Sequence, residues 1–243
     1  MQALPLREMT RRGRGRLKPQ LGAQFHQAFF SDSPALACAQ ARATLLHASP
    51  NVWLLDNFVS PDQLLRLIGL LPDSDEFEPS YTMDGEGVKV FDENRTSKFF
   101  HFEHPPSIVT LLKRKAADAL GVPMDHVQEP QFVWYDPKAF FNLHHDAGLL
   151  VEDTGEIVLP TDQPLRTATL FVYLNDLDPG IGCTAFPALD LRVTPKKGTA
   201  VLFPNITREG NAERSTVHAA EPLPEGCCKL GMNLWVTDRS LTW

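Results

Sequence analysis

The sequence is poor in cysteine, contains no long apolar run and carries no excess of positive charge, and each shortage excludes a class of protein. Its four cysteines form no C-x-x-C pair and are too few for a disulfide framework. The best apolar run, residues 64–71, contains Arg66 and falls short of the ~18 apolar residues that a membrane-spanning helix needs. The net charge of −7 argues against a surface built to coat nucleic acid. We therefore expect a cytoplasmic or nuclear protein with no membrane partner, and nucleic acid is a disfavoured partner.

The first 19 residues have a composition of their own. Six of them are Arg or Lys and only Glu8 is acidic, and the segment lacks the apolar stretch of a secretory signal. We interpret it as a basic flexible arm, with organelle targeting and contact with an acidic partner as alternatives. The whole chain is 43% hydrophobic and 22% charged, which is typical of a protein that buries a core. We therefore divide it into a basic arm with a helical extension, residues 1–50, and one folded domain, residues 51–243.

Helix signals gather in the first half of the chain, and strand signals gather in the second half. A Ser-Pro pair predicts a helix over 33–47, a capping box predicts one over 60–71, and a third runs over 107–120 to a glycine stop. From residue 131 onward, β-branched and aromatic segments alternate with turn residues. These segments are 131–135, 139–143, 167–174, 191–193, 199–203, 215–218 and 229–236. The pattern predicts a β-rich α+β fold, with a jelly-roll core over about 131–238 and the N-terminal helices packed on one sheet.

A His-x-Asp motif follows the second of these strands. Because residues two apart on a strand face the same side, His144 and Asp146 can contact one ion while His145 points away. His218, at the end of another predicted strand, is the natural candidate for a third ligand. Two imidazoles and one carboxylate on one side of an ion leave its other side open, which is the arrangement of non-haem Fe(II) oxygenases. The spacing alone is a weak signal, because a chain with eight histidines contains about one such pair by chance.

A lysine within an apolar strand strengthens this interpretation. An oxygenase of this kind needs a co-substrate that supplies two electrons, and 2-oxoglutarate can chelate the metal through its keto-acid end. Its other carboxylate then requires a cation inside the protein. Lys229, next to Leu230 at the start of an apolar strand, is such a cation, since a lysine in a buried strand must be paired or functional. The alternative is a strand lysine whose ammonium reaches solvent.

The order of the motifs resembles the prolyl 4-hydroxylases, a family of Fe(II)/2-oxoglutarate dioxygenases, over residues 52–236. The matching stretches are QFVWYDP (131–137) before His144-His-Asp146, RTATLFVYLND (166–176), a glycine turn with Thr184, Phe186 and Pro187, VTPKKGTAVLFPN (193–205), His218 with Pro222, and Lys229 with Trp235 six residues later.

The resemblance implies a double-stranded β-helix and assigns the site residues. It implies that Fe(II) is bound by the catalytic residues His144, Asp146 and His218. It also implies that Lys229 forms a salt bridge with the distal carboxylate of 2-oxoglutarate. Further co-substrate contacts are assigned to Tyr135, Thr169 and Tyr173, and substrate contacts to Arg166, Trp235 and Arg95.

The activity that the resemblance implies is hydroxylation of a proline-containing peptide or protein at prolyl residues. The reaction consumes 2-oxoglutarate and O2 and releases succinate and CO2, with ascorbate as an added cofactor. Lys138 and Phe141 depart from the family, which usually has glycine and often tyrosine there, and these departures concern the substrate. The alternatives are a 2-oxoglutarate oxygenase acting on a non-prolyl residue, a small molecule or nucleic acid, and a non-catalytic metal-binding jelly-roll module.

Overall fold

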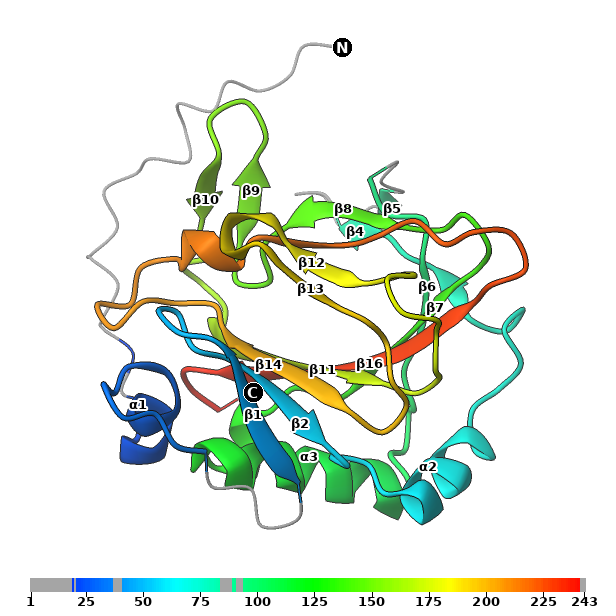
Figure 1. Cartoon of the computed structure of the whole chain (residues 1–243), viewed down its shortest axis with the longest axis horizontal. Helices are drawn as coiled ribbons and strands as arrows, with labels where there is room; N and C mark the ends of the chain where they lie inside the picture. The colour runs from blue at the N-terminus through cyan, green and yellow to red at the C-terminus, as the bar shows by residue number, and fades with distance from the viewer. Residues whose placement is uncertain (1–18, 20, 37–40, 84–88, 91–93, 241–243) are drawn as a thin grey trace.

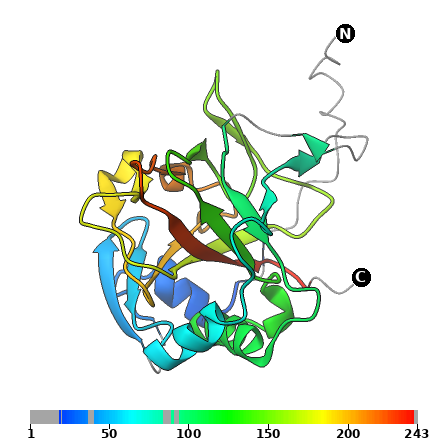
Figure 2. The same ribbon diagram turned by 90° about the vertical axis from the view of Figure 1, so that its right-hand side faces the viewer.

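The computed structural model describes residues 19, 21–36, 41–83, 89–90 and 94–240, so most of the predicted basic arm lies outside the described residues. Two antiparallel sheets face each other (Figure 1). The α-helices lie on the side of the larger sheet that faces away from the smaller one, as Figure 2 also shows. This arrangement confirms the predicted jelly-roll core with helices on one sheet.

The larger sheet has eight strands in the order β1-β2-β14-β11-β16-β7-β6-β3, and the smaller has four in the order β13-β12-β15-β8. The strands of the larger sheet are β1 Arg42–His47, β2 Val52–Asp56, β3 Glu78–Pro79, β6 Lys98–Phe100, β7 Gln131–Tyr135, β11 Arg166–Tyr173, β14 Ala200–Pro204 and β16 Lys229–Thr237. Those of the smaller sheet are β8 Phe141–His144, β12 Thr184–Phe186, β13 Leu191–Val193 and β15 His218–Ala220.

Two short strand pairs and the helices complete the described chain. The pairs are β4 Thr82–Met83 with β5 Lys89–Val90, and β9 Leu149–Val151 with β10 Glu156–Val158, which projects from the body of the molecule (Figure 1). The α-helices are α1 Ala23–Phe29, α2 Pro61–Ile68 and α3 Ser107–Leu120, and the 3-10 turns are η2 Met124–His126, η3 Pro187–Leu189 and η4 Arg214–Thr216. None of the described helices is long and apolar enough to cross a membrane.

The strands of the larger sheet divide their side chains between two hydrophobic layers. On β11, Ala168, Leu170 and Val172 pack in the layer between the larger sheet and the helices. Phe171 and Tyr173 pack in the layer between the two sheets. Successive side chains of a strand point to opposite faces, so both layers are filled by one sequence run. A strand covered on both faces reads as a nearly continuous apolar segment, which explains why the sequence predicts this strand well.

The predicted helix over 33–47 is wrong. Residues 31–36 are not helical, and Arg42–His47 form β1, which pairs with β2 at the edge of the larger sheet. This pairing overrides the helix preference of the alanines, because propensity is weak compared with tertiary contacts. The turn at 48–51, between two apolar runs, is the signal for a hairpin. The helix of the N-terminal extension is α1 instead.

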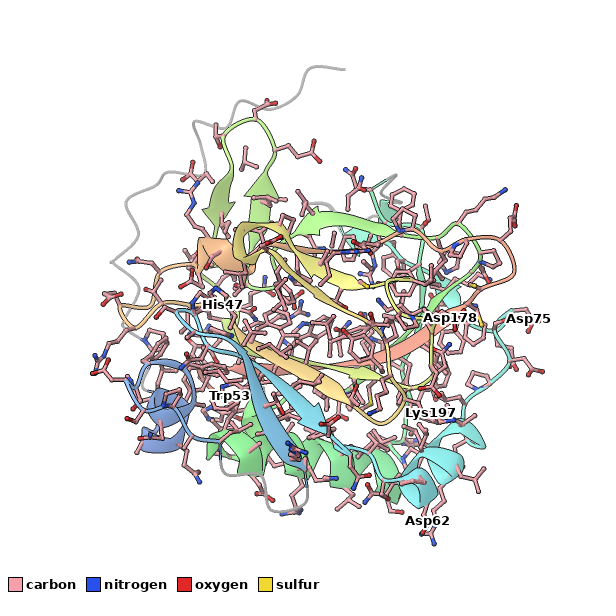
Figure 3. The ribbon with its side chains drawn as sticks, in the orientation of Figure 1. His47, Trp53, Asp62, Asp75, Asp178 and Lys197 are labelled. Atoms are coloured by element: carbon pink, nitrogen blue, oxygen red, sulfur yellow. The ribbon has the colours of Figure 1, made fainter. Side chains whose placement is uncertain are left out.

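Helix α1 shares the core beneath the larger sheet. Phe25 and Ala28 are fully buried in the same cluster as residues of α3 and β11. The side chains of Asn51 and Trp53 both donate to the Ala28 carbonyl, at 3.1 and 3.0 Å. Figure 3 shows Trp53 on the side of the molecule where α1 lies. These contacts tie the N-terminal extension to the domain that follows it.

The other two predicted helices are confirmed, and two predicted strands shift. Ser60 and Gln63 form the capping box that opens α2, and α3 ends at Gly121, whose φ of +63° is a left-handed conformation that favours glycine. The strand predicted over 139–143 is β8, Phe141–His144. The strand predicted over 215–218 is wrong in its bounds, because residues 214–216 form a 3-10 turn and β15 begins at His218.

Replacing Phe25 with alanine tests whether α1 is part of the cooperative fold. Phe25 is 0% exposed, and emptying a buried phenylalanine site costs about 3–5 kcal/mol. We expect a loss of that size in the free energy of unfolding, measured by urea denaturation. Phe30→Ala, at a half-buried position on the same segment, is the control and should cost less. Equal stability of Phe25→Ala and the unmodified protein would contradict the shared core.

Candidate active site

The predicted metal ligands come together between the two sheets. His144 is the last residue of β8 and His218 the first of β15, and the two are direct partners across the paired strands. Asp146 lies in the turn that follows β8. One side-chain donor atom from each residue lies within 4.8 Å of the other two. His145 faces away, as predicted, with its Nε2 3.2 Å from the Glu213 carbonyl oxygen.

Hydrogen bonds to the backbone set the tautomer of both imidazoles. His144 Nδ1 lies 2.9 Å from the Asn142 carbonyl oxygen, and His218 Nδ1 lies 3.0 Å from the Thr216 carbonyl oxygen. A carbonyl oxygen only accepts, so each Nδ1 donates a hydrogen and each Nε2 keeps its lone pair. The two Nε2 atoms lie 3.8 and 3.9 Å from carboxylate oxygens of Asp146, too far for hydrogen bonds. Three lone-pair donors therefore converge without a proton between them, and a cation satisfies all three.

The electrostatics of the cluster keep His144 and Asp146 in their metal-binding forms. Burial, aided by the neighbouring His218, lowers the pKa of His144 to about 3. Burial opposes ionisation of Asp146, but the facing His218 and His144 and a hydrogen bond from Thr169 hold the pKa of that carboxyl well below its usual range. Metals bind neutral imidazole and ionised carboxylate. With two nitrogen donors and one oxygen donor, the residues present fit Fe(II).

An aromatic ring and one short backbone segment contact the strand that carries His144. Phe141 stacks on the His144 imidazole, with ring centroids 3.6 Å apart and planes 9° from parallel. The Arg95 guanidinium lies 4.7 Å from the centroid of the Phe141 ring. Residues 94–96 run beside β8, through a bridge between Arg95 and Phe141 and backbone hydrogen bonds on either side of it. The sequence analysis named Phe141 only as a departure from the family. Residues three apart on a regular strand face opposite sides, so the spacing does not predict this contact.

Two polar side chains lie behind the Asp146 carboxylate. Thr169 Oγ1 donates to Asp146 Oδ2 at 2.7 Å, and Asn205 Nδ2 donates to Thr169 Oγ1 at 2.9 Å. The resemblance assigned Thr169 to 2-oxoglutarate, whereas its hydroxyl here contacts Asp146. The sequence analysis assigned Asn205 no role. The sequence feature that could have indicated a role is its position, as a polar residue directly after the apolar strand β14.

Lys229 is buried among aromatic rings on the inner face of the larger sheet. Its side chain is 1% exposed, and its Nζ donates to the Gly182 carbonyl oxygen at 2.9 Å. The rings of Tyr135, Phe171 and Tyr173 lie 5.3 to 5.7 Å from Nζ. Among the described residues, no carboxylate forms a salt bridge with it. Burial lowers the pKa of Lys229 to about 7.

The two tyrosines beside Lys229 keep their phenolic hydrogens. Burial raises the pKa of both Tyr135 and Tyr173. Tyr173 donates to Thr184 Oγ1 at 2.8 Å. One ammonium and two phenols in an apolar enclosure form a suitable binding site for a carboxylate, because the enclosure strengthens each interaction. The structure thus gathers three of the four predicted co-substrate residues at one place.

The predicted substrate residues form a second cationic surface. The Arg166 guanidinium lies 3.5 Å from the centroid of the Trp235 ring, and its Nε donates to Gln128 Oε1 at 3.0 Å. Burial lowers the pKa of Arg166 to about 10, so it is charged at neutral pH. The indole Nε1 of Trp235 is buried and has no hydrogen-bond partner among the described residues. Arg95 donates to Ser97 Oγ at 2.9 Å.

Comparisons with known proteins agree with this geometry. Residues 130–237 match the family model of the 2OG-Fe(II) oxygenase superfamily. The prolyl 4-hydroxylase subunit alpha-1 of Gallus gallus is 32% identical over 140 residues, which are 58% of this chain and 25% of that protein. The chain thus spans about a quarter of the length of that relative. Prolyl 4-hydroxylase 1 of Arabidopsis thaliana is 25% identical over 221 residues, covering 84% of this chain and 73% of that protein.

Solved structures share the fold. A viral collagen prolyl hydroxylase from Paramecium Bursaria Chlorella virus-1, in complex with 2-oxoglutarate, superposes with a TM-score of 0.59 at 23% identity, over 79% of this chain and 98% of that one. A prolyl-4-hydroxylase from Pseudomonas putida gives a TM-score of 0.52 at 18% identity, over 79% of this chain and 95% of that one. At these identities the likeness concerns the fold. Residues 130–237 thus form a domain that is similar to the 2OG-Fe(II) oxygenase superfamily, and the chain is similar in sequence and fold to prolyl 4-hydroxylases.

Proposed function

We propose that this protein is an Fe(II)- and 2-oxoglutarate-dependent dioxygenase that hydroxylates a peptide or protein at prolyl residues. The observation that carries the proposal is the buried Lys229 ammonium without a carboxylate partner, on the inner face of the sheet that the His-Asp-His cluster also faces. A buried charge is costly unless it is paired, so this site favours an anionic ligand. A non-catalytic metal-binding module has no need for it.

Each residue of the site has a part in the proposed reaction. Fe(II) held by His144, Asp146 and His218, together with 2-oxoglutarate and O2, supplies the oxidation of a substrate C–H bond to C–OH, with release of succinate and CO2. The lone pairs of the two Nε2 atoms and the Asp146 carboxylate hold the ion from one side. Lys229 neutralises the distal carboxylate of 2-oxoglutarate. Ascorbate enters the proposal as an additional reductant, on the family resemblance alone.

The surface of Arg166 and Trp235 supports a peptide substrate. The Arg166 guanidinium, which lies against the Trp235 ring, donates hydrogen bonds and suits the carbonyl oxygens of a peptide. A proline-containing segment presents carbonyl acceptors where the proline itself lacks an N–H, so donors on the protein match it. The relatives that are named prolyl 4-hydroxylases point to the same substrate class. A cytoplasmic or nuclear location also belongs to this proposal, with organelle targeting by the basic segment 1–19 as the alternative.

Replacing Lys229 with methionine tests the co-substrate site. Methionine keeps most of the side-chain volume and removes the charge, and losing one partner of a buried charge pair costs about 2–5 kcal/mol. We expect the Kd for 2-oxoglutarate to rise on the order of 100-fold, measured anaerobically from the visible charge-transfer absorption of the Fe(II)-loaded protein. Lys138→Met, at an exposed lysine, is the matched control and should leave the Kd unchanged. An unchanged Kd in Lys229→Met would rule out Lys229 as the carboxylate partner.

The pH dependence of co-substrate binding is a second test. An ammonium is charged below its pKa, and the pKa of Lys229 in the free protein is about 7. Above that pH, 2-oxoglutarate must bind together with a proton, so its Kd should rise by up to about tenfold per pH unit. Titrations between pH 6 and pH 9 measure the slope. Lys229→Arg stays charged over this range, and its slope should be flat; a slope equal to that of the unmodified protein would assign the titration to another group.

The third test concerns the substrate. We expect the Fe(II)-loaded protein to convert 2-oxoglutarate to succinate in the presence of proline-rich peptides and to add one oxygen atom to the peptide, detected by mass spectrometry. His144→Ala should abolish both products. Arg166→Met should raise the KM for the peptide by about tenfold or more, because it removes donors from the peptide surface, while the Kd for 2-oxoglutarate stays constant. Succinate release without a peptide requirement would move the proposal to a non-peptide substrate.

A further inference from the structure

We propose that Asn205 is a positioning residue of the metal site. Through the Thr169 hydroxyl, its amide N–H holds one oxygen of the Asp146 carboxylate and leaves the other oxygen for the ion. The inference rests on the proposed function only in requiring that His144, Asp146 and His218 bind a divalent cation.

The direction of the hydrogen bonds follows from the charge of Asp146. An ionised carboxylate only accepts, so the Thr169 hydroxyl, 2.7 Å from Oδ2, must donate to it. A hydroxyl has one hydrogen, and the Thr169 oxygen is therefore an acceptor toward Asn205. The Asn205 Nδ2, 2.9 Å away, supplies the N–H. The chain of donation runs from the amide to the hydroxyl to the carboxylate, and each bond polarises the next.

The rest of the Asn205 side chain argues against a role in stability alone. The residue is 0% exposed, and its amide oxygen has no hydrogen-bond partner among the described residues. A buried polar atom without a partner destabilises a fold relative to an apolar group of the same shape. Turning the amide would make its oxygen accept from Thr169 and would take the hydroxyl hydrogen away from Asp146. The orientation that leaves the amide oxygen unpaired is thus the one that serves the carboxylate.

The backbone fixes where Asn205 lies. It follows directly on β14, whose pairing with β11 aligns Phe203 with Thr169. Its N–H donates to the Thr167 carbonyl at 2.8 Å, and its carbonyl accepts from the Glu213 N–H at 3.0 Å. A side chain anchored on both sides of its own backbone has little freedom, so its amide group holds Thr169 at a fixed place.

Asp146 needs such support more than the two histidines do. Each imidazole is oriented by a hydrogen bond from its own Nδ1 to the backbone carbonyl two residues before it. Asp146 lies in a turn, and its carboxylate can rotate. Among the described residues, the Thr169 hydroxyl donates a hydrogen bond to this carboxylate, at Oδ2. The other oxygen, Oδ1, lies 3.8 Å from His144 Nε2. Partners of this kind typically change metal affinity 10- to 100-fold when removed.

The test uses Co(II) as the probe on the metal-free full chain, with binding measured by calorimetry and ligand geometry by the visible absorption of Co(II). We expect Thr169→Val, which keeps the shape and removes the hydroxyl, to raise the Kd for Co(II) about 10- to 100-fold and to shift the absorption. Thr169→Ser keeps the hydroxyl and should restore both readouts. Asn205→Asp keeps the shape but has no N–H, so it should act like Thr169→Val.

Two further variants separate positioning from folding. Asn205→Ala removes the amide without introducing a buried charge, and it should weaken Co(II) binding in the unmodified background. In the Thr169→Val background it should add nothing, because the hydroxyl through which Asn205 acts is gone. An equal loss in both backgrounds, or an unchanged Kd and spectrum in Asn205→Ala, would overturn the role of Asn205 alone. Failure of the unmodified chain to bind Co(II) would instead overturn the proposed function, and this inference with it.

Discussion

The fold depends on the central strands of the larger sheet, whose side chains point alternately into two hydrophobic layers. In β11 and β14, one set of side chains builds the core beneath the helices, and the alternate set faces the smaller sheet. The stability of the domain and the chemistry of the site thus come from the same strands but from opposite faces. The apolar layer between the sheets also encloses the polar groups at its centre. In that enclosure a carboxylate, an ammonium or a guanidinium interacts far more strongly than it does in water.

Three buried ionisable groups at the centre of the protein form no salt bridge with one another. Asp146 faces two imidazoles, Lys229 contacts a carbonyl oxygen and three aromatic rings, and Arg166 lies flat on Trp235. A protein that needed these charges only for stability would pair them with one another, because burial penalises each of them. In the proposed function each group has a different ligand: a metal cation at the carboxylate, a co-substrate carboxylate at the ammonium, and substrate carbonyl groups at the guanidinium.

Much of this site could be predicted from the sequence, because its residues lie in strands with clear periodicity. His144 and Asp146 share a motif, and Lys229 is conspicuous in an apolar strand. Thr169 was assigned to the co-substrate, and its hydrogen bond to Asp146 could not be predicted, since the alternation on β11 gives its face and not its partner. Asn205 has no local pattern, and only the pairing of β14 with β11 brings it to Thr169. The segment 42–47 was misread as a helix for the same reason: its partner, β2, decides its conformation, and that partner is a tertiary contact.

The strand that carries His144 is the outermost of the smaller sheet, and this has a mechanical consequence. The outer side of β8 is bordered by residues 94–96. Arg95, assigned to the substrate side, thus shares a backbone ladder with Phe141, whose ring is stacked on the imidazole of His144. A force on this arginine reaches the metal ligand through one ladder and one pair of rings.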